Sequence, residues 1–153
     1  VVVEPEPGRR ALASQVGADA VIDPIARPDL AAAIAEASGR PVIDVVFECA
    51  GIPPTINQSV SLVRRGGVVS LVGMPNRPAE IQAAEWMIKE VRLSSSLAYL
   101  REEFDIAQHL VADGRLQLEP LHSDTVPLAG MDGAFARLSQ SPNDIKILVD
   151  PRA

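Results

Sequence analysis

Acidic and small residues follow short apolar runs at three places in this chain, and these residues are the best suited to chemistry. Glu4 follows the first run, the stretch Ile43–Gly51 reads IDVVFECAG, and a third run ends at Gly73. Small residues at the carboxyl end of a parallel strand let a ligand lie against the backbone, and open α/β sheets bind ligands at that edge. The pattern therefore indicates a ligand-binding edge, although a buried strand can also end in Ala-Gly only to turn a corner.

Groups for metal binding or covalent catalysis are scarce. Zinc sites need several nitrogen, sulfur or oxygen ligands at characteristic spacing, and Cys49, His109 and His122 show no such spacing. We interpret both histidines as surface or structurally satisfied residues, and Cys49 as a small buried packing residue rather than a nucleophile. No Ser/His/Asp or Cys/His arrangement is supported, so the sequence predicts no catalytic or metal-binding residue among these 153 positions.

Alternating strands and helices are expected to position this edge. The run within Ile43–Glu48 is almost unbroken, which is typical of a strand covered on both faces. Further strands are predicted at 1–3, 20–22 and 67–72, with helices at 9–16, 28–38 and 53–63. The arginines and glycines at 64–67 are expected to end the last of these helices. This rhythm with short loops favours right-handed crossovers and a parallel sheet.

Residues beyond Gly73 depart from this rhythm. A short helix is predicted at 83–89, followed by a more polar strand at Val91–Leu97 that suits a sheet edge. The segment Arg101–Asp113 has the pattern of an amphipathic helix, with an inward face made by Phe104, Ala107, Leu110 and Val111. The tail is read as extended at 116–126, helical at 128–138 and a strand at 145–149.

Composition narrows the class of protein. With 47% hydrophobic but only 3% aromatic residues, the core must be built from Val, Ile, Leu and Ala, which favours α/β layers. The net charge of −6 and the scattered Lys and Arg residues argue against nucleic acid or an anionic membrane as a partner. No apolar run approaches the ~20 residues that span a bilayer. The single cysteine excludes an intramolecular disulfide and fits a reducing compartment, so a cytoplasmic protein is expected.

Five segments carry a resemblance that covers essentially the whole chain. They read EPEPGRRALASQVGADAVIDP, DVVFECAG, RRGGVVSLVG, SLAYLREEF and SPNDIKILV. In order and spacing they resemble the coenzyme half of the medium-chain zinc-dependent alcohol dehydrogenases, and the last two look most like the butanediol dehydrogenase branch. The resemblance implies a Rossmann-like, doubly wound, mostly parallel sheet. It also implies a catalytic domain, a first strand and a glycine-rich turn that this sequence lacks, since no G-x-G-x-x-G occurs in it.

By this resemblance, residues 1–114 form a partial dinucleotide-binding domain, and residues 115–153 return towards the absent catalytic domain. The parent enzyme would transfer hydride between a secondary alcohol or diol and NAD, with zinc held by ligands outside this chain. The chain alone is expected to be inactive, with weak or no NAD affinity, because the phosphate-binding turn is missing. The edge at Val91–Leu97 is expected to pair across a two-fold axis, as in the family's dimers.

The resemblance also implies which residues contact the cofactor. Glu4 would accept hydrogen bonds from the adenosine ribose hydroxyls and repel a 2′-phosphate, which favours NAD over NADP. Arg9 would lie near the same ribose and Lys146 on the pyrophosphate, and Asp23 would border the adenine. Each of these residues can also be read as an ordinary surface charge. The remaining contacts, steric or through the backbone, would come from Cys49, Ala50 and Gly51 beside the ribose and adenine, and from Val72, Gly73, Met74, Ser96, Leu97 and Ala98 at the nicotinamide end.

Two other functions stay open on the sequence alone. An S-adenosylmethionine-dependent methyltransferase also uses an acid after its second strand to hold a ribose. A non-enzymatic association module would bind no nucleotide. Calorimetry with S-adenosylmethionine and with NAD separates the methyltransferase from the dehydrogenase. Failure to bind any nucleotide at millimolar concentration, together with stable folded oligomers, would favour the association module.

Overall fold

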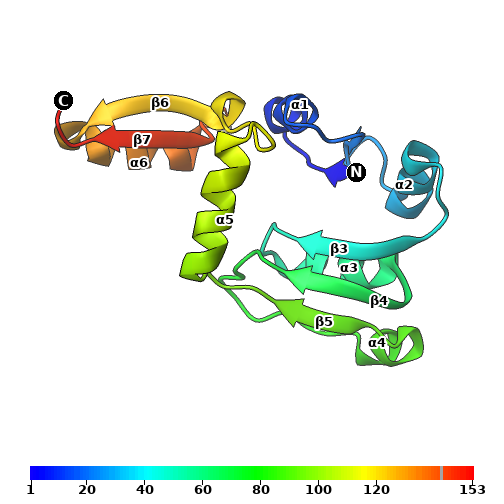
Figure 1. Cartoon of the computed structure of the whole chain (residues 1–153). Helices are drawn as coiled ribbons and strands as arrows, with labels where there is room; N and C mark the ends of the chain where they lie inside the picture. The colour runs from blue at the N-terminus through cyan, green and yellow to red at the C-terminus, as the bar shows by residue number, and fades with distance from the viewer. Residues whose placement is uncertain (142) are drawn as a thin grey trace. The chain divides into compact units, whose positions relative to one another are not determined.

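The computed structural model describes residues 1–141 and 143–153; Pro142, which belongs to the closing segment quoted above, lies outside the described residues. The chain divides into two compact units (Figure 1). Unit 1 comprises residues 1–29 and 102–153, and unit 2 comprises residues 30–101. Every strand pair in both units is parallel, which confirms the predicted α/β class with parallel sheets.

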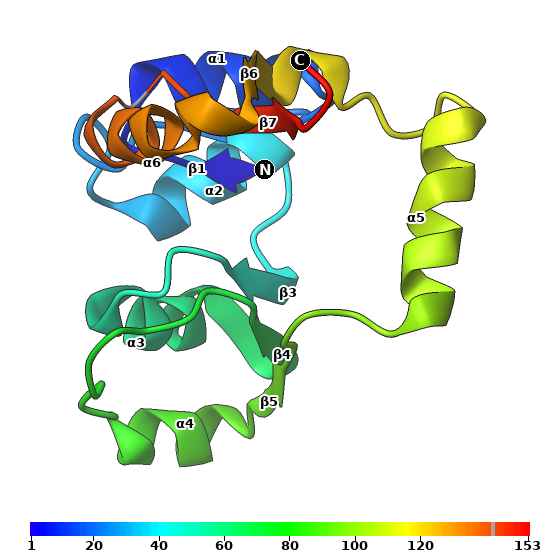
Figure 2. The ribbon, with the colours of Figure 1, turned by 90° about the vertical axis from the view of Figure 1, so that its left-hand side faces the viewer.

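Unit 2 is built on a three-stranded sheet in the order β3-β4-β5. Its strands are β3 (Ile43–Glu48), β4 (Val63–Leu71) and β5 (Arg92–Ser95), and its helices are α2 (Leu30–Ser38), α3 (Pro53–Leu62) and α4 (Ala83–Lys89). Figure 2 shows α3 and α4 on the same side of the sheet. Within the described residues β5 pairs with β4 alone, so the prediction that this strand lies at a sheet edge is confirmed.

The core of unit 2 is a cluster of valines between α3 and the sheet. Val60, Val63 and Val69 are at most 1% exposed. Around them pack the partly buried side chains of Val46, Leu71, Trp86 and Val91. Fully burying a valine side chain contributes about 1.5–3 kcal/mol, so this cluster holds α3 and α4 against one face of the sheet.

Lys89, the last residue of α4, closes the end of α3. Its ammonium group donates hydrogen bonds to the carbonyls of Val60, Ser61 and Val63. The last carbonyls of a helix lack partners within the helix, and a lysine can supply them. This contact joins the two helices over the core.

Removal of this ammonium is expected to destabilise unit 2. Lys89→Met keeps the aliphatic stem and should lower the free energy of unfolding by about 1.5–3 kcal/mol, the usual contribution of a hydrogen bond to a charged group. Urea unfolding measures the change. Lys146→Met is the matched control, because Lys146 is exposed and is the only other lysine of the sequence. Equal unfolding midpoints for the two variants would contradict the capping role.

The prediction that both faces of β3 are buried is wrong. Val45 is 45% and Phe47 68% exposed, whereas Val46 faces the core. The helices that contact the core cluster both pack on the Val46 face of the sheet. An apolar run indicates that burial on both faces would be favourable, but it cannot show which element supplies the second layer.

The end of the third predicted helix also differs from the expectation. The helix ends at Leu62, and the segment 63–67 already belongs to β4. Its register with β3 is irregular, since Val63 pairs with Ile43 but Val68 pairs with Val45. Gly67 is buried, and a Cβ there would lie 2.5 Å from Val63 Cγ2. Gly67 therefore serves a close backbone approach inside a strand rather than a helix stop, whereas Gly66 has a φ of +69°, which favours glycine.

Unit 1 contains two pairs of strands, each built around a helix. The first pair consists of β1 (Val2–Val3) and β2 (Val21–Ile22), with α1 (Pro7–Gln15) between them. After α5 (Arg101–Ala112) come η1 (Glu119–Leu121), β6 (His122–Pro127), η2 (Leu128–Gly130), α6 (Met131–Gln140) and β7 (Lys146–Asp150). Figure 1 shows β6 and β7 side by side with α6 along them.

The tail strands are tied together by Arg137 of α6. Its guanidinium pairs with Asp124 of β6 at 2.6 Å and with Asp144 before β7 at 3.0 Å. The hydrogen bond from Arg137, together with the N–H of Thr125, holds the pKa of Asp124 below its ordinary value. One arginine thereby fixes the approach of both tail strands to their helix.

The predicted inward face of α5 is not buried. Phe104 is 47% and Val111 42% exposed, and this helix has no buried residue. An amphipathic pattern shows which face could be buried without specifying its partner. The tail segment expected to be extended contains a 3₁₀ turn at 119–121, with a proline in its first positions. Among the described residues, no helix combines the length and apolar character that crossing a bilayer requires.

Candidate functional site

Three loops leave the carboxyl ends of neighbouring strands in unit 2. The segment Cys49–Gly51 follows β3, Val72–Met74 follows β4 and Ser96–Ala98 follows β5. Because the strands are parallel and adjacent, the loops gather at one edge of the sheet. The structure thus brings together all nine unit 2 residues that the sequence assigned to a binding site.

Backbone hydrogen bonds join these loops in sequence. The carbonyl oxygen of Glu48, at the end of β3, accepts the N–H groups of Val72 and Gly73, both at 2.8 Å. The carbonyl oxygen of Leu71, at the end of β4, accepts the N–H of Ser96 at 3.0 Å. Each strand end therefore positions the loop that follows its neighbour.

Glycine is required where the first two loops touch. A Cβ on Gly73 would lie 2.2 Å from the backbone nitrogen of Gly51 and 2.8 Å from the carbonyl carbon of Cys49. A Cβ on Gly51 would lie 2.7 Å from the carbonyl oxygen of Met74, and Gly51 has a φ of +65° that favours glycine. Packing between the loops thus accounts for both glycines, and their contact with a ligand stays a prediction.

The same edge exposes large apolar side chains. Val72 is 48%, Met74 72% and Leu97 79% exposed. Exposed apolar groups gathered at one place mark binding surfaces more often than scattered ones do. Ala98 has a φ of +56°, a conformation that costs energy for a residue with a Cβ. An edge with small backbone-lined turns and an apolar rim suits a flat, partly apolar ligand.

Cys49 lies in the first loop and has an exposed residue surface. Burial of its thiol, together with the neighbouring Glu48 carboxylate, raises the pKa of Cys49 above the ordinary thiol value. The expected burial of Cys49 is wrong, because the residue lies in the loop beyond the end of β3 rather than in the core. Since the thiolate is the reactive form, the raised pKa still argues against a role as a nucleophile.

Labelling of Cys49 by a disulfide reagent is therefore expected to be slow. At pH 7.5 the rate should be below that of glutathione, because less thiolate is present, and it should rise as the pH increases past the ordinary thiol pKa. Absorbance of the released thiol gives the rate. Cys49→Ser provides the blank, since the sequence has no second cysteine. A rate equal to that of glutathione would contradict the raised pKa.

In unit 1, Glu4 lies at the end of β1 and is half-buried. Its Oε1 accepts the N–H of Glu6 at 2.8 Å, and its carbonyl accepts a hydrogen bond from Arg10 at 2.8 Å. Arg10 also pairs with Asp23 at 2.8 Å. The N–H of Ile25 is the main cause that lowers the pKa of Asp23, and Arg10 lowers it further.

Arg10 is a residue that the sequence reasoning missed. Arg9, which the sequence assigned to the site, is exposed on the first turn of α1. Arg10 instead braces the loop after β1 through the carbonyls of Glu4 and Pro5. The Arg-Arg pair at the helix start was the available signal, but it did not show which arginine points back to the loop.

Asn143 lies close to the start of α1. A Cβ on Gly8, in the first turn of α1, would lie 2.8 Å from Asn143 Oδ1, so the turn before β7 lies against the start of α1 within unit 1. Lys146, which the sequence assigned to the site, is exposed at the start of β7, and its N–H donates to Ser123 Oγ at 3.3 Å. The contact of its ammonium group with a ligand stays a prediction.

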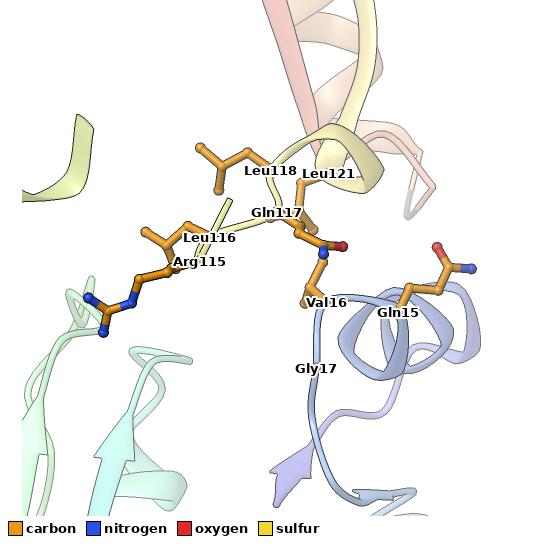
Figure 3. Close-up of a pocket in the computed structure, with 8 residues that line it drawn as sticks. All are labelled: Gln15, Val16, Gly17, Arg115, Leu116, Gln117, Leu118 and Leu121. Carbon is orange, nitrogen blue, oxygen red and sulfur yellow. The ribbon is translucent and has the colours of Figure 1, made fainter. Parts of the chain in front are cut away.

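Two further features lie outside the predicted site. In the part of the chain that the structure describes, no three His, Cys, Asp or Glu side chains come together as possible metal ligands. A cavity of about 300 Å³ in unit 1 is lined by Gln15–Gly17, Arg115–Leu118 and Leu121 (Figure 3). None of the residues assigned to the site from the sequence lines this cavity.

Comparison with known proteins places these features in a family. Residues 1–113 match the family model described as zinc-binding dehydrogenase. The chain is 33% identical, over all of its 153 residues, to 2-dehydro-3-deoxy-L-galactonate 5-dehydrogenase of Pseudoalteromonas atlantica, of which it covers 44%. It is 40% identical over 119 residues to a protein of Rhizobium meliloti described as a D-xylulose reductase, matching 77% of this chain and 34% of that protein.

Solved structures of the same kind match over nearly the whole chain. The 2R,3R-butanediol dehydrogenase of Bacillus subtilis has a TM-score of 0.85 and 29% identity, with 97% of this chain and 42% of that chain covered. A structure described as a zinc-binding dehydrogenase of Sinorhizobium meliloti bound to NADP has a TM-score of 0.81 and 30% identity, with 97% and 44% covered. The chain thus spans less than half the length of the proteins it matches, and corresponds to their C-terminal part.

Proposed function

The chain belongs to the zinc-binding dehydrogenase family, and from that premise we propose that it is the NAD-binding portion of an alcohol or diol dehydrogenase. The longer protein that would contain it, called the full-length protein below, transfers hydride between a secondary alcohol and NAD. The names of the relatives support an alcohol or polyol substrate, since they include a butanediol dehydrogenase and xylulose reductases. The comparisons give no support to a methyltransferase.

The observation that carries this proposal is the edge formed by the three interlocked loops of unit 2. Their small residues, held by backbone hydrogen bonds, suit a cofactor that lies flat along the strand ends, and the apolar rim of Val72, Met74 and Leu97 suits its nicotinamide. A bound nicotinamide supplies hydride chemistry, and the backbone groups of these loops would orient its ring. Zinc would be held by ligands outside these 153 residues.

The choice between NAD and NADP rests on Glu4. A carboxylate at the end of β1 would bind ribose hydroxyls and repel a 2′-phosphate, whereas Arg9, exposed nearby in sequence, would attract one. The structural relative bound to NADP shows that the other cofactor occurs among similar proteins. We propose NAD as the preferred cofactor.

We also propose that two segments of the chain have different roles. Residues 1–114 would supply the nucleotide contacts, and residues 115–153 would return to the remainder of the full-length protein. β5, exposed along its length at a sheet edge, would pair with a second copy to form a dimer.

Titration of the full-length protein with NADH, followed by the shift of nicotinamide fluorescence, tests the proposal. Saturable binding of NADH and reduction of NAD in the presence of 2,3-butanediol or a polyol are expected. The 153-residue chain alone should show neither turnover nor tight binding. Absence of NADH and NADPH binding to the full-length protein would refute the proposed function.

A further inference from the structure

Glu48, the last residue of β3, accepts several hydrogen bonds from the loop that follows it. Its residue surface is 4% exposed, although it is an acid. Its Oε1 accepts the N–H of Ala50 at 3.0 Å, the N–H of Gly51 at 3.0 Å and the hydroxyl of Thr55 at 2.6 Å. A buried carboxylate is costly unless it is hydrogen-bonded in this way.

The same residue holds the second loop through its backbone. The carbonyl oxygen of Glu48 accepts the N–H groups of Val72 and Gly73. The side chain thus shapes the turn that contains Gly51, and the main chain anchors the turn that contains Gly73. The backbones of these two turns are in close contact, so a displacement of one turn would also displace the other.

The carboxylate also connects this edge to α3. Thr55 lies in the first turn of that helix, and its hydroxyl donates to Glu48. The amino end of a helix carries a partial positive charge, which favours a nearby anion. The helix therefore fixes the carboxylate, and the carboxylate fixes the loop.

We propose that Glu48 is the positioning residue of the coenzyme site, an inference that rests on the proposed function. It does not touch the cofactor. It holds the Cys49–Gly51 turn flat, so that the backbone there stays clear of the space in which the ribose would lie. Without the acceptor, the N–H groups of Ala50 and Gly51 lose their partners, and the turn rearranges to expose them to water.

Two substitutions separate positioning from charge. Glu48→Gln retains an oxygen that can take the three bonds of Oε1 and loses only the longer bond from the N–H of Gly51 to Oε2 at 3.3 Å, so NADH affinity should stay within about threefold of the original. Glu48→Ala leaves both N–H groups without an acceptor, and the Kd for NADH should rise about tenfold or more. The KM for NAD should rise with it, while kcat changes much less, because the reacting groups are untouched. Glu80→Ala, an exposed acid of the same unit, is the control and should leave Kd unchanged.

Hydrogen exchange supplies a readout independent of the cofactor. In the full-length protein, amides of the segment 49–51 should exchange faster in Glu48→Ala and remain protected in Glu48→Gln. If Glu48→Ala fails to fold, Thr55→Val removes one donor to the carboxylate and should raise Kd about threefold.

The outcomes distinguish this inference from the proposed function. An original protein that binds NADH, together with a Glu48→Ala variant that binds it equally well despite faster exchange at 49–51, overturns the positioning role alone. An equal loss in Glu48→Gln and Glu48→Ala overturns it as well. An original protein that binds no nicotinamide nucleotide overturns the proposed function, and this inference with it.

Discussion

Gly73→Ala is expected to disrupt nucleotide binding more than the same substitution at any other glycine of the described residues. The new Cβ would be placed 2.2 Å from the backbone nitrogen of Gly51, and backbone cannot rotate away as a side chain can. One of the two turns must move, which also stretches the hydrogen bonds from Val72 and Gly73 to Glu48. Forcing extra volume into a packed site costs about 1–3 kcal/mol, and the displaced turn would occupy cofactor space.

Urea unfolding and NADH titration of the full-length protein measure both effects. The variant should unfold at lower urea and bind NADH at least about tenfold more weakly. Gly133→Ala is the control, because a Cβ there meets no atom within 4 Å and the residue lies within helix α6. It should stabilise the protein by about 0.5–1 kcal/mol. A Gly73→Ala variant that binds NADH normally would show that the two turns do not need their close contact.

Glu4→Gln is expected to reduce the discrimination between NAD and NADP. Glutamine keeps the length of the side chain and can still accept the N–H of Glu6, but it loses the charge that would repel a 2′-phosphate and bind two hydroxyls. A hydrogen bond to a charged group contributes about 1.5–3 kcal/mol, so the ratio of kcat/KM for NAD over NADP should fall by one to two orders of magnitude.

Steady-state kinetics with both cofactors give this ratio. Glu6→Gln removes the same charge from an exposed neighbour in the loop and should leave the ratio nearly unchanged. Equal falls in the two variants would assign the preference to general electrostatics rather than to Glu4. An original protein that prefers NADP would contradict the assignment altogether.

Local patterns predicted several elements of this fold accurately. The bounds expected for the strand Ile43–Glu48 and for the helix Ala83–Lys89 are those of β3 and α4. The strand is a continuous apolar run that ends in small residues, so neighbouring residues in the sequence are enough to predict where it begins and ends. The parallel pairing followed from the alternation of strands and helices, because such connections are too long for hairpins.

Features that depend on distant partners could not be predicted in this way. The pair Gly66-Gly67 has the appearance of a helix stop, but the need for glycine at 67 comes from the close approach of the Asp44 carbonyl, which exists only once β3 and β4 are paired. The exposed faces of β3 and α5 have apolar patterns, but these patterns do not identify the element that would pack against them. A hydrophobic pattern shows which face of an element could be buried. Whether that face is buried depends on the element that packs against it.

The candidate site shows the same division. The glycines and small residues at the strand ends were predicted, since their positions follow from the strands themselves. Glu48 and Arg10 were missed at the site, and Lys89 in the core, because an acid or base that bonds to backbone groups has no distinctive spacing. Their roles appear only when the carbonyls and N–H groups they satisfy are located.

Parallel pairing throughout has a consequence for how the protein reaches its native state. Val46 pairs with Val69 and Val69 with Leu93, so each strand meets its neighbour only after an intervening helix has been made. Among the strands that the structure describes, no antiparallel hairpin is available to form early and nucleate a sheet, and such non-local contacts slow folding. During folding, strands with exposed valines therefore remain unpaired until the following helix and strand have formed. We expect this chain to fold slowly and to self-associate transiently while it folds.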